Sequence, residues 1–232
     1  MQENSTRQLE QWLVSEKGQA ILQQELAKVA PVMSHSFGYL ALQIDLPGID
    51  YLALHHARRK FILSSNDNNT SCSTHPYINA IPTQIPLESQ SVDLVVLPHT
   101  LELYPHAKHI LKEVRRILIN EGKIVILGFN PLHPSRLQQL YHSPLAPPIP
   151  YRRQFSQHRI KEWFKLLGFE LIEQPISSRF TPWFSRKDSF YMLVARKRSF
   201  GMHLVGPAIR KKKKTTAETA VATRQMHKQH IK

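Results

Sequence analysis

Residues 91–131 constrain the fold of this chain more than any other segment. They open with Val92-Asp-Leu-Val-Val-Leu97, an apolar run typical of a strand buried on both faces of a sheet. An amphipathic stretch follows from Pro105 to Ile119, and a second apolar run, Lys123 to Leu127, comes after the turn Asn120-Glu-Gly122, whose glycine suits a positive φ. Strands that alternate with helices predict an α/β sheet of the doubly wound type.

The other segments extend this pattern on both sides. Apolar runs predict further strands at 39–44, 60–63, 78–81, 169–173 and 190–195. The last two are joined without a clear helix, so we expect an antiparallel strand at the edge of a mostly parallel sheet. Apolar spacing predicts an N-terminal helix over 7–29, closed by Pro31, and a helix from the cap residue Ser156 to Leu167, ended by Gly168.

The positive charge is concentrated at the C-terminal end of the chain. The formal net charge is +14, of which residues 196–232 carry +10 and contain one acid, Glu218. We therefore expect a helical extension at 1–36, an α/β domain at 37–206 and a disordered basic tail at 207–232. Such a tail predicts non-specific, salt-sensitive contact with nucleic acid, and it has no interleaved aromatic residues for base stacking.

Composition and spacing exclude several other classes of protein. No apolar run approaches the roughly 18 residues of a spanning helix and no secretory signal is present, so we expect a cytoplasmic protein without a membrane partner. The lone Cys72 cannot form an internal disulfide. The pairs His55-His56 and His106/His109 lack cysteine or carboxylate ligands at recognised spacing, so we expect no metal site.

One family has its motifs in the central segment. The strand Asp93-Leu-Val-Val96 is followed by Leu101-Glu102, by a helix ending in Glu113-Val-Arg-Arg-Ile-Leu118, and by the turn Asn120-Glu-Gly122. In order and spacing this resembles the class I S-adenosylmethionine-dependent methyltransferases of the type 11 branch. The resemblance implies a Rossmann-like sheet, S-adenosylmethionine as cofactor and methyl transfer as the activity.

The resemblance extends over roughly residues 9–206. The phrases Phe37-Gly-Tyr-Leu-Ala-Leu-Gln43, Gly128-Phe-Asn-Pro131 and Ala195-Arg-Lys-Arg198 are similar to those of an uncharacterised bacterial subgroup of methyltransferase-like proteins. We therefore expect a bacterial protein in which the basic tail alone lies outside the family pattern.

The predicted cofactor site lies at the carboxyl ends of the strands. In an open α/β sheet a cofactor sits where the strand order reverses, so the ends near Asp45, Ser64 and Pro98-His99 should converge on one crevice. In the family the loop after the first strand carries Gly-x-Gly, which lets the backbone approach the cofactor. Here that loop reads Asp45-Leu-Pro-Gly48, with one glycine and a proline that removes a backbone donor.

The family's two acids are also replaced. An acid after the second strand usually binds the ribose hydroxyls, and here Ser64 stands in its place. The residue expected near the adenine is Ile81. We expect cofactor contacts from Asp45, Gly48, Ser64, Pro98 and His99.

Each candidate also has a structural interpretation. Asp45 can end its strand and cap the next turn, and His99 can be a base near neutral pH or a buried structural histidine. On the substrate side we expect Asn130, together with Tyr151 and Arg152 in the proline-rich segment 144–155.

Three functions remain open from the sequence. The first is methyl transfer to an unidentified acceptor, a small molecule or RNA, which needs alignment of the acceptor and at most one base. The second is a non-catalytic binding protein that keeps the fold with a degenerate cofactor loop. The third is a nucleic-acid-associated protein whose tail contacts phosphates.

Overall fold

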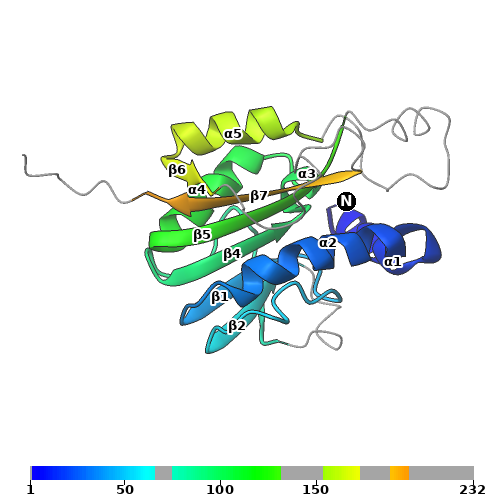
Figure 1. Cartoon of the computed structure of the whole chain (residues 1–232), viewed down its shortest axis with the longest axis horizontal. Helices are drawn as coiled ribbons and strands as arrows, with labels where there is room; N and C mark the ends of the chain where they lie inside the picture. The colour runs from blue at the N-terminus through cyan, green and yellow to red at the C-terminus, as the bar shows by residue number, and fades with distance from the viewer. Residues whose placement is uncertain (1, 66–74, 132–153, 173–188, 199–232) are drawn as a thin grey trace, which may run out of the picture. The chain divides into compact units, whose positions relative to one another are not determined.

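The described part of the chain is built around one seven-stranded sheet with the order β3-β2-β1-β4-β5-β7-β6 (Figure 1). The computed structural model describes residues 2–65, 75–131, 154–172 and 189–198. The predictions on Cys72, Tyr151, Arg152 and the basic tail lie outside these residues. The strands are β1 (Leu40–Ile44), β2 (Arg59–Ser64), β3 (Tyr77–Asn79), β4 (Val92–Pro98), β5 (Leu118–Phe129), β6 (Phe169–Leu171) and β7 (Phe190–Lys197).

The direction of the strands confirms the predicted fold class. The pairs from β3 across to β5 are all parallel, whereas β7 is antiparallel to both β5 and β6. The strand β7 therefore lies between β5 and the short edge strand β6. This is a mostly parallel Rossmann-like sheet with an antiparallel hairpin at one side.

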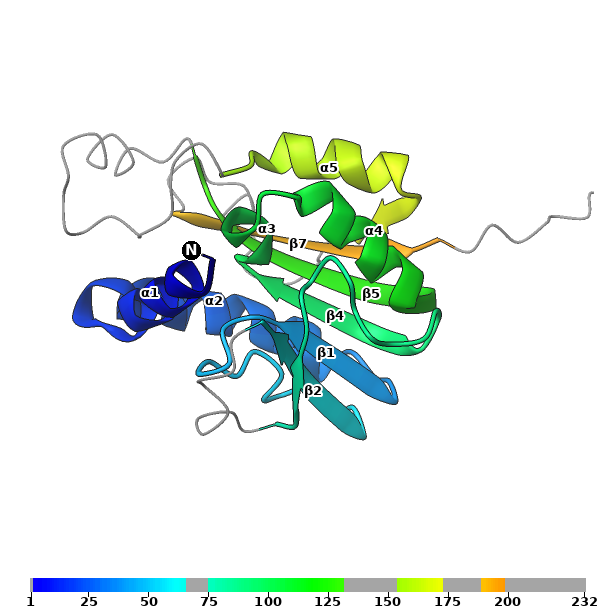
Figure 2. The same cartoon turned by 180° about the vertical axis from the view of Figure 1, so that it is seen from behind.

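Helices cover the sheet on both faces. The helices are α1 (Gln2–Val14), α2 (Glu16–Ser34), α3 (Thr100–Leu103), α4 (Ala107–Ile117) and α5 (Gln157–Leu166). Figures 1 and 2 show α2 on one face of the sheet and α4 on the other. The buried stripe of α4 consists of Ala107, Ile110, Leu111, Val114 and Ile117, at the spacing that the sequence predicts.

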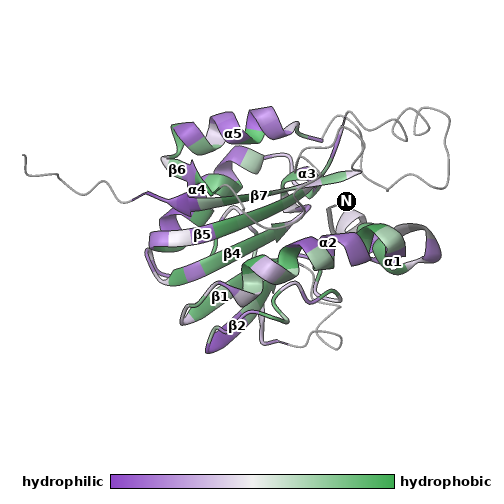
Figure 3. Cartoon of the chain, viewed as in Figure 1, coloured by the Kyte–Doolittle hydropathy of each residue, from purple (hydrophilic) through white to green (hydrophobic). Residues whose placement is uncertain are grey.

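The core lies along the central strands. Hydrophobic colouring runs through most of β4 and β5 in Figure 3. Both strands are buried on both faces over most of their length, as expected for parallel strands between two layers of helices.

The N-terminal extension differs from the single helix that the sequence predicts. It forms two helices that break at Ser15, whose hydroxyl donates to Trp12 O at 2.6 Å and whose backbone is extended. Gly18 keeps the two helices close, because a Cβ there would lie 2.2 Å from Trp12 O. Pro31 does not close the second helix, which continues to Ser34; in this last turn proline removes only one hydrogen bond.

The predicted end of α4 was partly wrong, whereas the predicted ends of α5 were confirmed. After α4 the positive φ belongs to Glu121, at 65°, and Gly122 lies within β5. The strand continues through this turn, so the helix ends two residues earlier than predicted, at Ile117. Helix α5 is flanked by the predicted residues: Gly168, with a φ of 68°, follows its C-terminal end, and Ser156 caps its start with a hydroxyl that accepts from Arg159 N.

Candidate active site

The carboxyl ends of three adjacent strands form the candidate site. In the sheet β1 lies between β2 and β4, so the residues that follow these strands are neighbours in space. Asp45, Ser64 and His99 lie here, and each is at most 1% exposed. Pro98 ends β4 beside them and is also buried. The structure thus brings four of the five predicted cofactor contacts together, and Gly48 lies on the loop that starts from the same point.

Backbone strain concentrates at this edge of the sheet. Asp45 has a φ of 70°, Leu46 of 51° and His99 of 55°. A left-handed conformation costs a residue with a side chain about 1–2 kcal/mol. Directly after β1 and β4 the backbone therefore adopts a conformation that favours glycine, although the residues there carry side chains.

Gln43 holds the first loop in this shape. Its side-chain amide donates to the carbonyl oxygens of Asp45 (3.0 Å), Leu46 (3.0 Å) and Ile49 (2.8 Å). Its side-chain oxygen accepts from Tyr51 N at 3.0 Å. The residue is fully buried. Our sequence prediction missed this role, although one amide inside the apolar run Leu40-Ala-Leu-Gln-Ile44 is a visible signal, since a buried amide must find partners.

Asp45 lies among hydroxyl groups. Tyr104 donates to Asp45 Oδ1 at 3.0 Å and lies 3.2 Å from Ser65 Oγ. Burial raises the pKa of Asp45 to about 7, although the nearby hydroxyl groups of Tyr104, Ser64 and Thr100 act in the opposite direction. Asp45 therefore changes its protonation state near neutral pH.

Two buried polar atoms at this edge have no hydrogen-bond partner within the described residues. They are Asp45 Oδ2 and Ser64 Oγ, at the ends of the adjacent strands β1 and β2. A buried polar atom without a partner is costly, and a ligand with complementary groups would remove that cost. The pair therefore points to a polar ligand at this edge of the sheet.

The N-terminal helix α1 closes over the first loop. The Glu10 carboxylate accepts a hydrogen bond from Gly48 N, and a Cβ at Gly48 would collide with that carboxylate. Trp12, on the same helix, packs edge-on against Phe129 with ring centroids 6.0 Å apart. Figure 1 shows α1 beyond the carboxyl ends of the strands, on the side of α3. The backbone donor of the only glycine in the loop is thus already used.

His99 is held in a buried network of charges. Its Nε2 lies 2.9 Å from Glu25 Oε1 and its Nδ1 lies 3.3 Å from Glu102 Oε2, while its ring stacks on Phe129 at 4.0 Å. Tyr51 donates to the other oxygen of Glu25 at 2.8 Å. The network links α2 to the ends of β4 and β5.

The charge state of His99 follows from these contacts. Burial by itself lowers the pKa of His99, but the nearby carboxylates of Glu25 and Glu102 outweigh it and raise the pKa to about 9. At neutral pH the ring is therefore an imidazolium that donates from both nitrogens, and it has no free lone pair to accept a proton.

The remaining predicted positions are more scattered. Asn130 follows β5, is 8% exposed, and its backbone nitrogen donates to Ser189 O at 2.9 Å. Ile81 is 52% exposed. Among the described residues no group of three or more histidine, cysteine, aspartate or glutamate side chains is placed to hold a metal ion. Nor does any helix in the described ranges have the length and apolar character needed to cross a membrane.

The sheet and the turns at its carboxyl edge define a class of protein. Five parallel strands, an antiparallel strand next to β5, and a strained turn after β1 that faces the ends of β2 and β4 describe the Rossmann-like fold of class I methyltransferases.

Comparison with known proteins places the chain in that family. A family model described as a methyltransferase domain matches residues 38–126. The uncharacterized protein YafS of Escherichia coli is 33% identical over 180 residues, which cover 71% of this chain and 73% of that protein. The chain belongs to the class I S-adenosylmethionine-dependent methyltransferases, and it is an enzyme of that family.

Solved structures share the fold at low sequence identity. A SAM-dependent methyltransferase from Thermotoga maritima has a TM-score of 0.63 and 14% identity, covering 84% of this chain and 97% of its own. A SAM-dependent methyltransferase from Archaeoglobus fulgidus has a TM-score of 0.56 and 15% identity, covering 77% and 94%. A Haloferax volcanii protein, solved in complex with the Trm112 methyltransferase activator, has a TM-score of 0.60 and 14% identity, covering 82% and 98%.

The residues at the strand ends fit the cofactor that the family implies. Asp45 Oδ2 can accept from a donor of the cofactor, and Ser64 Oγ can bond to a hydroxyl, because both atoms are buried without a partner in the described part of the chain. Gly48 N fits only when the Glu10 carboxylate moves away from it.

Proposed function

We propose that this enzyme binds S-adenosylmethionine across the ends of β1, β2 and β4 and transfers its methyl group to an acceptor, a small molecule or RNA, at the same edge of the sheet. The observation that carries the proposal is the pair of buried, unpartnered atoms Asp45 Oδ2 and Ser64 Oγ on adjacent strand ends. Both atoms are buried at a strand end, and a bound ligand would give them partners.

Each residue of the crevice then has a distinct role. Asp45 and Ser64 bind polar groups of the cofactor, Gly48 supplies a backbone donor, and Pro98 forms an apolar wall. His99 acts as a positioning residue, because its two nitrogens are committed to Glu25 and Glu102. On the substrate side we keep Asn130, with Tyr151 and Arg152, as contacts of the acceptor.

The chain contributes to the reaction mainly by position and by exclusion of water. The sulfonium of the cofactor supplies a methyl group that is already activated, so the protein needs to align the acceptor and to keep the crevice dry. The helix α1 suits the second task, since it contacts the first loop through Glu10 and the end of β5 through Trp12. A protonated His99 cannot be the base that takes a proton from the acceptor. The acceptor must therefore react without losing a proton, or it must lose its proton to another group.

The first experiment is calorimetric titration of the protein with S-adenosylmethionine and S-adenosylhomocysteine. We expect binding, and we expect Glu10→Ala to increase the affinity about fivefold to tenfold, because the carboxylate occupies the Gly48 donor that the cofactor needs. The matched control is Glu16→Ala, which removes an exposed acid from the start of α2. Equal affinities of wild type and Glu10→Ala would show that Glu10 does not compete. Absence of any heat of binding in both the wild type and Glu10→Ala would contradict the proposed cofactor site.

The affinity for the cofactor should rise with pH. Below pH 7 Asp45 is mostly neutral and its proton prevents Oδ2 from accepting a hydrogen bond; above pH 7 it is ionised and accepts one. We expect about eightfold tighter binding at pH 7.5 than at pH 6, measured by calorimetry. In Asp45→Asn binding should be weaker and nearly independent of pH over this range. A wild-type affinity that is equal at both values would remove Asp45 from the site.

A second function is favoured by one observation. Gly48 N, which the family uses toward its cofactor, is closed by Glu10, and Pro47 removes a further donor from the loop. A non-catalytic protein that keeps the fold for binding would have this arrangement. Absence of cofactor binding in Glu10→Ala as well as in wild type is the result that would favour it.

The proposed methyltransferase function places the enzyme in the bacterial cytoplasm, and the Escherichia coli relative supports the bacterial part of this proposal.

A further inference from the structure

A basic and aromatic surface lies at the opposite end of the sheet from the crevice. It consists of Phe37, Tyr39, His56, Arg58, Arg59 and Lys60, which precede or begin β1 and β2, and we name it the amino-end patch. The aromatic side chains are exposed, Phe37 by 76% and Tyr39 by 54%. The crevice lies one strand length away, about 17 Å for the five residues of β1.

The patch is continuous in space. Arg59 N donates to Tyr39 O at 2.9 Å, and the Arg58 guanidinium lies 5.8 Å from the centre of the Tyr39 ring. Phe37 stacks on His56 with ring centroids 5.9 Å apart and planes 19° from parallel. Phe37 is therefore paired with His56, and Tyr39 lies beside Arg58.

Within the described residues the three cations of the patch have no acidic partner. Arg58, Arg59 and Lys60 make no ion pair with any described residue. The carboxylate of Asp93 accepts two backbone hydrogen bonds, from Tyr39 N and Leu40 N, both at 2.8 Å.

The local field beside the patch is positive. Burial, and then the charge of Lys60, lower the pKa of His55 to about 4. His56 and Lys123 act in the same direction, and the carboxylate of Asp93 acts against them.

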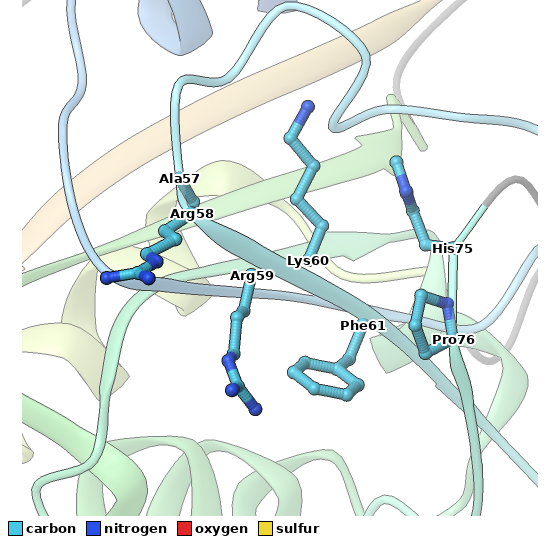
Figure 4. A pocket seen from close by; sticks show the side chains of 7 residues that line it. All are labelled: Ala57, Arg58, Arg59, Lys60, Phe61, His75 and Pro76. Carbon is cyan, nitrogen blue, oxygen red and sulfur yellow. The ribbon is translucent and has the colours of Figure 1, made fainter.

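A groove of about 540 Å³ opens beside the cations. It is lined by Ala57, Arg58, Arg59, Lys60, Phe61, His75 and Pro76. Figure 4 shows Arg59 and Phe61 on one side of β2 and Lys60 on the other, as the alternation of a strand requires. Cationic and apolar groups thus line the same hollow.

We propose that the amino-end patch binds single-stranded nucleic acid, with its bases stacked on Phe37 and Tyr39 and its phosphates on Arg58, Arg59 and Lys60. An arginine guanidinium binds phosphate in a bidentate manner, and an exposed flat ring stacks on any base. A duplex hides the faces of its bases, so the exposed rings select single strands. The proposal does not depend on methyl transfer, and its readout is binding alone.

The test uses the full-length chain and a fluorescein-labelled RNA of about 12 nucleotides in an anisotropy titration. We expect Arg58→Gln/Arg59→Gln to weaken binding about tenfold at about 0.1 M salt and to reduce the slope of log affinity against log salt by about 1.4. We expect Phe37→Ala/Tyr39→Ala to weaken binding about tenfold with an unchanged slope, because rings release no counterions. The charges after residue 198 are the same in all variants, so they cancel in each comparison.

Matched variants control for charge and for surface area. Lys108→Gln/Lys112→Gln removes two exposed positive charges from α4, and Leu166→Ala removes an apolar side chain that is 82% exposed. Both should bind the RNA within about twofold of wild type. Loss of binding in the α4 variant equal to that in the arginine variant would overturn the proposal, because general charge would then explain both.

Further titrations distinguish single-stranded RNA from other ligands of the patch. DNA of the same sequence should bind similarly, since neither stacking nor phosphate contact requires a 2′-hydroxyl. Equal competition by double-stranded RNA would overturn the selection of single strands. Binding to phosphatidylserine vesicles that requires the patch, with RNA binding unchanged in the arginine variant, would overturn the proposal in favour of a lipid surface.

A measurement without substitutions checks the same site. RNA that carries 4-thiouridine should cross-link on irradiation to peptides that contain residues 37–39 or 56–61. Cross-links confined to residues after 198 would overturn the proposal, because the basic tail would then be the sole site of contact.

Discussion

His99→Ala should lower the free energy of unfolding by about 3 to 5 kcal/mol at pH 7. The substitution leaves the Glu25 and Glu102 carboxylates buried and facing the same space without the cation between them. It also removes the ring that stacks on Phe129. Urea unfolding followed by circular dichroism measures the effect.

The control for this prediction is His106→Ala. His106 is exposed before α4, so its loss should change the free energy by less than about 0.5 kcal/mol. The double variant Glu25→Gln/His99→Gln should be more stable than the sum of the single changes, because the two residues interact directly. Strict additivity would contradict a coupled pair.

The pH dependence distinguishes charge from packing. The pKa of His99 is raised from 6.5 to about 9, so its stabilising contribution is present in full below pH 6.5 and is lost as the pH rises through 9. The wild type should lose about 3 kcal/mol over this window beyond what the double variant loses. Glu25 on α2, Glu102 on α3 and Tyr51, bonded to Glu25, are the titratable groups that face the pair. Equal losses in both proteins would mean that His99 stabilises by packing alone.

Gln43→Leu should destabilise the protein by about 2 to 4 kcal/mol and abolish most of the cofactor affinity. Leucine has a similar size, but it leaves three loop carbonyls and Tyr51 N without the partner that now binds them. The strained turn at Asp45 and Leu46 would then lose its support. Urea unfolding and calorimetric titration with S-adenosylmethionine measure the two effects.

Gln23→Leu is the matched control, since Gln23 is exposed on α2. It should leave both stability and affinity near wild type. Gln43→Glu provides a stricter test of the hydrogen bonds, because a carboxylate would face the same three carbonyl oxygens and repel them. Wild-type behaviour of Gln43→Glu would show that the amide donors do not hold the loop.

The sheet and its order of elements could be predicted because local patterns determine them. The apolar run in β4 and the three-to-four spacing of α4 depend only on residues close in sequence. The break at Ser15 was missed because a serine within an amphipathic pattern does not reveal whether the chain turns there. That turn depends on the close approach of Gly18 to Trp12 O.

The sequence could predict which candidate residues lie together, but not the contacts that they make. Asp45, Ser64 and His99 converge because parallel strands end at one edge, a rule that needs only the order of strands. The role of His99 could not be read in the same way, since its partner Glu25 lies 74 residues earlier on α2. Only the packing of that helix decides that the ring is charged.

The sequence by itself determined the α/β sheet and the family, and it placed Asp45, Ser64 and His99 at one edge of the sheet, because periodicity and motif spacing are local properties of the chain. The tertiary structure alone decided that Glu10 closes the Gly48 donor, that Gln43 holds the strained loop, and that Phe37 and Tyr39 join Arg58 and Arg59 in one exposed patch. Each of these depends on contacts between side chains and backbone that lie in different elements, and the free energy of such contacts is set only when the elements pack.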